Sequence, residues 1–190
     1  MVIVVLMLFC SMATKAQFAQ ISYSLHNGVQ PGISVSYLKS LSSKTKTKEK
    51  RKGTKTIVKT NYVSPQFNYF YHVQKEHNFS IGADLVRERH IDRKAHWRFS
   101  PSVGLFYVRS FNIGPTYEVS DDGEVNKIPL AGQNYLAPSV ALRIERNIRI
   151  KKDIRILLQP RMLFLLPYDV GVLPSGDLNL GIILPIKSHE

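Results

Sequence analysis

Apolar and polar residues alternate with a period of two along most of this chain. Between residues 63 and 73, Phe67, Tyr69 and Tyr71 share one face of an extended chain, whereas Ser64 and Gln66 share the other. Such alternation is typical of strands with one hydrophobic face. Seven further segments show it, at 33–38, 79–87, 97–109, 111–119, 136–145, 154–164 and 178–186. The pattern predicts an all-β fold of eight antiparallel strands.

The connections between these segments alternate in length. The long or polar ones span 42–54, 88–95, 120–133 and 167–177, and the short ones span 74–78, 109–112 and 146–152. A transmembrane β-barrel has long external loops at one end and tight periplasmic turns at the other. We therefore predict an up-and-down transmembrane barrel over residues 33–186, with the four long connections external. Residues 17–32 would form a lead-in or an extra strand, and residues 187–190 a tail.

The polar face of the predicted strands is rich in Gly, Ser, Ala and Asn rather than in the Lys, Glu and Thr of solvated sheets. Small side chains suit the narrow lumen of an eight-stranded barrel, which side chains alone can fill. Charged residues on this face have to pair, because an unpaired charge in a confined space is costly. The sequence predicts a lumen charge network of Asp84, Arg98, Glu118, Arg143, Glu145, Arg155 and Arg161.

A second fold would show the same alternation. A secreted soluble barrel or sandwich that binds a small ligand buries its apolar face and exposes its polar one. The two alternatives differ in the direction in which Phe67, Tyr69 and Tyr71 point, because those side chains face outward only in a membrane barrel.

The first sixteen residues have the features of a signal peptide. An apolar stretch, MVIVVLMLFC, is followed by a short polar run in which Thr14 and Ala16 satisfy the small-residue rule for cleavage. Cleavage after Ala16 would also remove Cys10, the one cysteine of the chain, which excludes disulfides and thiolate chemistry from the mature protein. We therefore expect an exported protein that begins at Gln17.

The chain resembles the small outer-membrane β-barrel family of Gram-negative bacteria, of the OmpA/OmpX-like eight-stranded type. The resemblance lies in the architecture of residues 33–186, the signal ending Lys15-Ala16-Gln17, and the strand openings Ser64-Pro65-Gln66-Phe67-Asn68-Tyr69 and Ser100-Pro101-Ser102-Val103-Gly104. It implies an outer-membrane location, contact with outer-membrane lipid, and assembly by the barrel-assembly machinery. The family often ends on an aromatic residue, whereas this chain ends Lys187-Ser188-His189-Glu190.

Charge is concentrated in one connection. The 190 residues hold 26 Lys+Arg and 14 Asp+Glu, a formal charge of +12, while 44% hydrophobic residues argue against a disordered chain. A dense basic cluster in the first long connection comprises Lys44, Lys46, Lys48, Lys50, Arg51, Lys52 and Lys55. Such a cluster attracts an anionic surface, lipopolysaccharide phosphates included. Because no aromatic residues are interleaved to stack bases, a specific nucleic-acid site is not expected. A merely solvated loop is the alternative.

Other chemistry has weaker support. His90, Asp92 and His96 could form a His–Asp dyad or a metal site at the barrel rim, but they lie among arginines and lysines that would repel a cation. The acidic group Asp121-Asp122-Gly123-Glu124 lacks the ligand spacing of a calcium loop. No phosphate-binding loop, dinucleotide fingerprint or nucleophile elbow is present, so we expect no cofactor.

These patterns favour a non-enzymatic outer-membrane barrel with a filled lumen. It would have a structural or surface-interaction role through its basic loop, with an unidentified protein partner. Eight strands are too few for a water-filled pore. An outer-membrane enzyme that modifies lipid or peptide at the barrel rim is the alternative function.

Overall fold

The computed structural model describes residues 17–50, 53–72, 76–91, 97–112, 114, 116–119, 122–128, 131–149, 153–168 and 171–186. The predicted signal peptide, residues 1–16, lies outside these ranges, as do Asp92, His96 and the tail 187–190.

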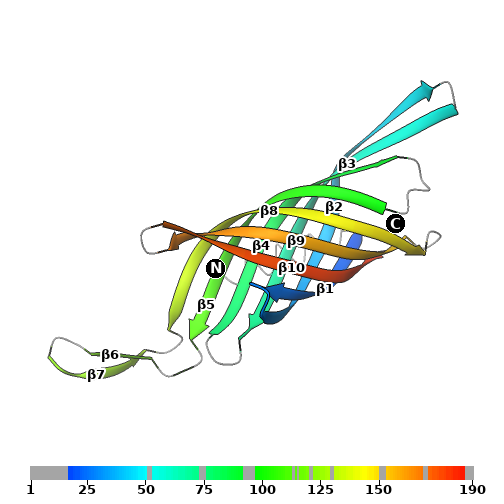
Figure 1. Cartoon of the computed structure of the whole chain (residues 1–190). Coiled ribbons are helices and arrows are strands. Elements are labelled where there is room, and N and C mark those ends of the chain that lie inside the picture. The colour runs from blue at the N-terminus through cyan, green and yellow to red at the C-terminus, as the bar shows by residue number, and fades with distance from the viewer. Residues whose placement is uncertain are drawn as a thin grey trace.

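Over the described residues, eight strands form a closed antiparallel barrel in the ring order β1-β10-β9-β8-β5-β4-β3-β2 (Figure 1). The strands are β1 (Phe18–His26), β2 (Gln30–Lys50), β3 (Gly53–Tyr71), β4 (Glu76–Ile91), β5 (Trp97–Asn112), β8 (Gly132–Arg149), β9 (Ile154–Tyr168) and β10 (Gly171–Pro185). β6 (Thr116–Val119) and β7 (Val125–Ile128) pair only with each other. Pairing of Phe18 with Pro185 joins the first strand to the last. The predicted fold class is therefore confirmed.

The eight barrel strands differ from the eight predicted ones at two places, and the differences cancel in the strand count. Residues 18–26, left as a lead-in or an extra strand, form β1. Its signal was the alternation before Asn27-Gly28, where both residues have positive φ, 49° and 74°, as a tight hairpin turn requires. Conversely, the predicted strand at 111–119 is not one barrel strand, because Phe111 and Asn112 end β5, whereas Thr116–Val119 form β6, which pairs with β7.

The prediction that the four long connections share one end is also wrong. We define the terminal end as the barrel end where β1 begins and β10 ends. The connections 42–54 and 88–95 lie at the terminal end, whereas 120–133 and 167–177 lie at the opposite end. The prediction counted one barrel strand too many at 111–119. Each later connection was therefore assigned to the wrong end of the barrel.

The apolar face of the strands points outward. Phe67 and Tyr71 are 39% and 36% exposed, whereas Ser64, Gln66 and Asn68 are buried inside the barrel. Other strands show the same arrangement, and one outward row across neighbouring strands consists of Val63, Leu85, Val103, Val140 and Met162. An apolar exterior around a polar interior is the arrangement of a barrel surrounded by lipid. It excludes the soluble barrel or sandwich, which would bury this face.

The lumen contains two apolar clusters separated by polar side chains. The cluster nearer the terminal end comprises Leu38, Tyr62, Val86, Leu157 and Ile183, with Phe18 packed against it. The cluster toward the opposite end comprises Phe106, Val108, Tyr135, Ala137, Leu163 and Leu165. Both lie across the narrow interior, so apolar side chains fill the lumen above and below its charged centre.

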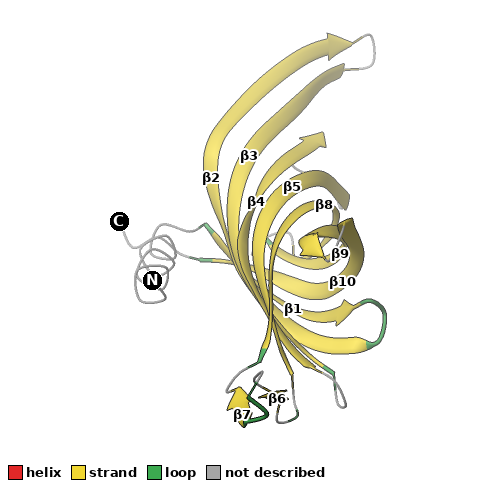
Figure 2. Ribbon diagram, turned by 90° about the vertical axis from the view of Figure 1, so that its left-hand side faces the viewer, coloured by secondary structure: helices red, strands yellow, loops and turns green. Residues whose placement is uncertain are grey.

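β2 (residues 41–50) and β3 (residues 53–60) continue past the end of β1 as a ribbon, whose base at 57–60 also pairs with β4 (Figures 1 and 2). β1 pairs with β2 only as far as Leu38, and the β2–β3 register shifts between Ser40 and Ser42, where Leu41 is the extra residue. Such a bulge bends and twists a strand pair, which agrees with the curvature of the ribbon away from the ring in Figure 2. The basic ribbon therefore projects from the terminal end.

Candidate functional site

A buried ion pair occupies the centre of the lumen. Arg161 on β9 donates through Nη2 to Asp84 on β4, and both side chains are fully buried. The same Nη2 lies 2.8 Å from Gln66 Oε1, and the guanidinium carbon lies 4.4 Å from the centre of the Phe106 ring. Arg143 donates to Gln20 across the lumen at 2.9 Å. These contacts join opposite walls of the barrel through its interior.

Two glycines make room for this pair. A Cβ on Gly104 would clash with Asp84 Oδ1 and lie 2.9 Å from Ser139 Oγ. A Cβ on Gly82 would lie 2.6 Å from the Phe106 ring that covers Arg161. The small residues of the polar face therefore set the space in which the larger charged side chains meet.

A second ion cluster closes the terminal end. Arg155 contacts Asp153 at 2.6 Å, Glu145 at 3.0 Å and Glu88 at 3.4 Å, and Arg98 contacts Glu88 at 2.8 Å. Arg143 Nε also contacts Glu145 of this cluster, at 3.2 Å. Its guanidinium group thus bridges Glu145 of the cluster and Gln20 on β1.

Asp153 lies in the turn before β9, at the mouth of this cluster. Burial by itself raises the pKa of its carboxyl, but the hydrogen bond and the charge of Arg155, together with the charge of Arg98, outweigh burial and lower the pKa. The carboxylate is therefore held in its charged form, as an ion cluster at the barrel mouth requires.

The structure brings six of the seven predicted network residues into the lumen, all except Glu118, which lies exposed on β6 outside the barrel. That prediction is wrong because Glu118 belongs to β6, which pairs with β7 and not with a barrel strand. Glu88 and Asp153 were missed, because both had been assigned to connections or their borders. With these two, the four lumen arginines face four carboxylates in the described residues of this network: Asp84, Glu88, Glu145 and Asp153.

The register of β2 and β3 places lysine positions of the basic ribbon opposite one another. Lys44 is paired in register with Lys59, Lys46 with Ile57, and Lys48 with Lys55. Because directly opposed residues share a face, Lys44, Lys46 and Lys59 lie on one side of the ribbon, and Ser43 and Thr45 lie on the other. Of the predicted basic cluster, Arg51 and Lys52 lie outside the described residues.

A Ser–His–Asp group that the sequence analysis missed lies at the opposite end. His26 Nδ1 is 2.5 Å from Asp177 Oδ1, and Ser175 Oγ is 3.1 Å from His26 Nε2. The same Oγ is also only 3.5 Å from Nδ1, so it lies beside the ring rather than in line with the Nε2 lone pair. Ser175 also donates to Asn27 in the β1–β2 turn, at 3.0 Å. The group thus joins β1 to β10, and it lacks the alignment of an activated serine.

The other predicted sites are not assembled in the described part of the chain. The predicted dyad or metal site of His90, Asp92 and His96 lies partly outside the described residues, and so does Asp121 of the acidic group. Among the residues described, no group of three or more His, Cys, Asp or Glu side chains is placed to hold a metal ion. No helix within the described ranges is long and apolar enough to cross a membrane.

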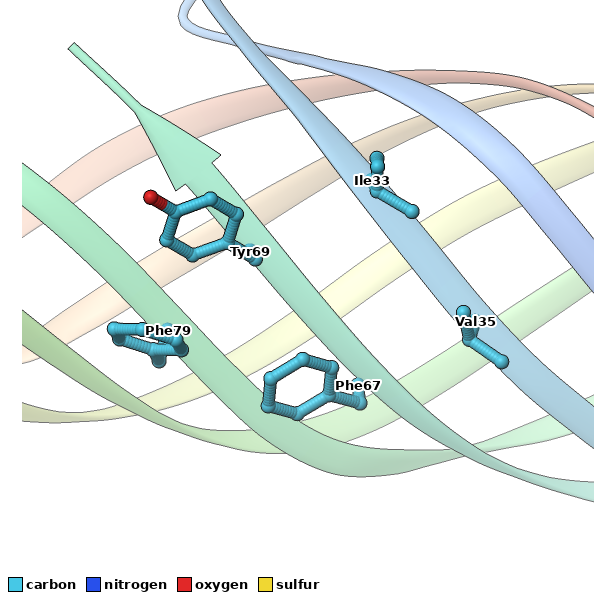
Figure 3. A pocket seen from close by; sticks show the side chains of 5 residues that line it. All are labelled: Ile33, Val35, Phe67, Tyr69 and Phe79. Carbon is cyan, nitrogen blue, oxygen red and sulfur yellow. The ribbon is translucent and has the colours of Figure 1, made fainter.

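The outward face of β2–β4 bears a shallow apolar groove of about 390 Å³ toward the opposite end. Ile33 and Val35 line one side, and the rings of Phe67, Tyr69 and Phe79 line the other (Figure 3). The Tyr69 hydroxyl contacts His77 Nδ1 at 2.7 Å beside the groove. A polar tip on an apolar ring is typical of aromatic residues at a membrane interface.

Solved structures share this architecture. Neisserial surface protein A (NspA) matches with a TM-score of 0.51 and 11% identity, over 89% of this chain and 96% of that one. The chain has the fold of a small outer-membrane β-barrel. Two further structures are similar: the outer membrane enzyme PagL, with a TM-score of 0.48 and 11% identity over 89% and 99% of the two chains, and Ail of Yersinia pestis, with 0.43 and 7% over 90% and 99%. No protein-family model matches the chain, and no curated protein is similar to it in sequence.

Proposed function

We propose that this protein is a non-enzymatic outer-membrane barrel with a closed lumen, which acts as a membrane anchor for the basic ribbon. The observation that carries the proposal is the filled interior. Arg161 and Asp84 meet at its centre without exposed surface, and apolar clusters lie on both sides of them. An ion crossing the lumen would have to break this pair, which supports an anchoring role rather than a channel.

The basic ribbon is the proposed interaction element. Its cluster of Lys44, Lys46, Lys48, Lys50, Arg51, Lys52 and Lys55 is the densest positive charge in the sequence. Exposed charge at this density attracts anionic surfaces over about 8–10 Å at physiological ionic strength. The proposed partners are anionic groups of the membrane, lipopolysaccharide included, and a protein partner of complementary charge.

Conductance measurements test the closed lumen. The full chain, extracted from outer membranes in detergent, is inserted into planar bilayers, and current is recorded under an applied potential. We expect no stable single-channel steps. Regular steps whose size changes in Asp84→Asn would overturn the proposal, because that result would place an ion path through the central pair.

The non-enzymatic part has its own test. Ser175→Ala removes the hydroxyl beside His26 with little change of volume. Cells that carry this variant should show the same outer-membrane lipid and protein profile as cells with the unchanged protein. A lipid or peptide product lost specifically in Ser175→Ala would contradict the proposal and favour an enzyme.

A further inference from the structure

Three cations stand directly opposite one another at the base of the ribbon. Lys44 on β2 is in register with Lys59 on β3, and Lys59 is in register with Arg89 on β4. We name these three residues the basic row. Lys44 and Arg89 are exposed and Lys59 is half-buried. Since neighbouring strands lie about 4.8 Å apart, three like charges are held side by side.

This arrangement costs stability unless anions neutralise it, because like charges directly opposed across strands repel one another. Among the described residues, no acidic side chain forms an ion pair with Lys44, Lys59 or Arg89. The carboxylate adjacent to Arg89 in sequence, Glu88, points into the lumen and pairs with Arg98. The basic row is therefore open to an anion supplied by its surroundings.

The face of the barrel wall on which the basic row lies indicates the source of the neutralising anion. Along β3, Lys59, Asn61 and Val63 lie on the same face, and Val63 begins the outward apolar row that continues through Leu85 and Val103. The basic row thus continues the lipid-facing wall. Four residues of strand span about 13 Å, which a strand tilt of about 40° reduces to about 10 Å along the membrane normal.

An interfacial pair lies two residues beyond the register of the basic row, on β5 and β8. Trp97 on β5 is 53% exposed, and the guanidinium carbon of Arg146 on β8 lies 5.3 Å from the centre of its ring. Tryptophan is enriched where hydrocarbon meets headgroups. Phe99, two residues along β5, is in register with Arg89. The basic row therefore lies at headgroup depth, beyond the edge of the apolar band.

We propose that Lys44, Lys59 and Arg89 bind the phosphate group of a membrane lipid in the leaflet at the terminal end. The inference rests on the proposed function, since it requires the barrel to lie in a bilayer. Lysine supplies point charges and arginine a fork of donors, the combination that suits a phosphate oxygen cluster. Lipid A and anionic glycerophospholipids both offer this chemistry, and they occupy opposite leaflets of an outer membrane.

Lipid binding to the full chain in non-ionic detergent tests the proposal. Three probes are titrated and followed by native mass spectrometry: bis-phosphorylated lipid A, phosphatidylglycerol and inorganic phosphate. The test variant is Lys44→Thr/Lys59→Thr/Arg89→Thr. The control variant, Lys48→Thr/Lys50→Thr/Lys55→Thr, removes the same number of positive charges from the distal part of the ribbon, farther from the apolar band.

We expect the test variant to lose affinity for one lipid by about a hundredfold, because each basic residue at a charged lipid surface contributes about fivefold. The control variant should lose less than about fivefold. Preference for lipid A would place the terminal end at the outer leaflet, and preference for phosphatidylglycerol at the inner one. Equal losses in both variants would overturn the proposal, as would binding of inorganic phosphate alone.

Stability in defined vesicles separates a ligand site from a structural role. In phosphatidylcholine vesicles the test variant should resist urea better than the unchanged protein, because repulsion within the basic row is gone. Addition of the preferred anionic lipid should stabilise the unchanged protein but not the variant. If the triple variant fails to fold, Lys44→Gln/Arg89→Gln serves in its place. Failure of every chain to float with vesicles would refute the membrane barrel itself.

Discussion

The central ion pair gives the sharpest prediction of stability. Replacement of Asp84 by Asn preserves the shape of the side chain and removes its charge, which leaves the Arg161 guanidinium in the lumen without its carboxylate. Both side chains are fully buried, so solvent does not screen the remaining charge. Breaking a buried pair by removing one partner typically costs about 3–5 kcal/mol.

The contacts that Arg161 retains place the expected loss of stability near the lower end of this range. Arg161 keeps its hydrogen bond to Gln66, at 2.8 Å, and its stacking on Phe106, at 4.4 Å. A cation–π contact contributes about 1–2 kcal/mol when desolvated. We therefore expect Asp84→Asn to lower the free energy of unfolding by about 3 kcal/mol. Asp84→Asn/Arg161→Gln should be more stable than the sum of the single changes by about 2 kcal/mol, since no lone charge remains.

Urea unfolding of the barrel in lipid vesicles measures these values. Trp97, the one tryptophan of the chain, lies on the outer wall and reports the loss of the lipid environment through its fluorescence. Gel mobility with and without heating gives an independent reading. Glu118→Gln is the matched control, because that carboxylate lies exposed on β6 and its loss should change stability by less than about 0.5 kcal/mol. Equal effects of Asp84→Asn and Glu118→Gln would refute the reasoning.

Three more expectations follow from the same geometry. Leu105→Arg places a charge on the outward face of β5 and should lower stability in vesicles by about 2–4 kcal/mol, whereas Val119→Arg on β6 should be nearly neutral. Gly104→Ala should destabilise the barrel by about 1–3 kcal/mol, because the added Cβ meets the Asp84 carboxylate; a stable, well-folded Gly104→Ala protein would contradict the lumen packing. The lowered pKa of Asp153 means that its ion pairs stabilise the barrel above the unfolded-state pKa and are lost as the pH falls through the folded-state value. Asp153→Asn should therefore flatten the acid limb of a stability–pH curve, which urea titrations between pH 2 and 6 would measure.

Alternation predicted the fold correctly because it reports an interaction that is local to each strand. Every second side chain of β3 meets the same surroundings, so Phe67 and Gln66 could be assigned to opposite faces without knowledge of their neighbours. The same locality caused the errors. The alternation at 111–119 has the same period whether the segment pairs with a barrel strand or with β7, and nothing within the segment distinguishes the two.

For the candidate sites too, features within one segment could be predicted, whereas features that depend on strand pairing could not. The lysines of the ribbon were visible in the sequence as a dense run, but the opposition of Lys44, Lys59 and Arg89 depends on the register of three strands. The His26–Asp177 contact joins residues 151 positions apart, through the closure of the barrel between β1 and β10. Register and closure arise only when strands pair.

The sequence by itself determined that this chain forms amphipathic strands with an apolar face for lipid and a polar face for a narrow lumen. It determined most of the charges that fill that lumen, because the period of two assigns each residue to a face. Only the tertiary structure decided which carboxylate meets which arginine, and at which end of the barrel the basic ribbon projects. These depend on strand count, register and closure, which are properties of pairs of strands rather than of any one of them.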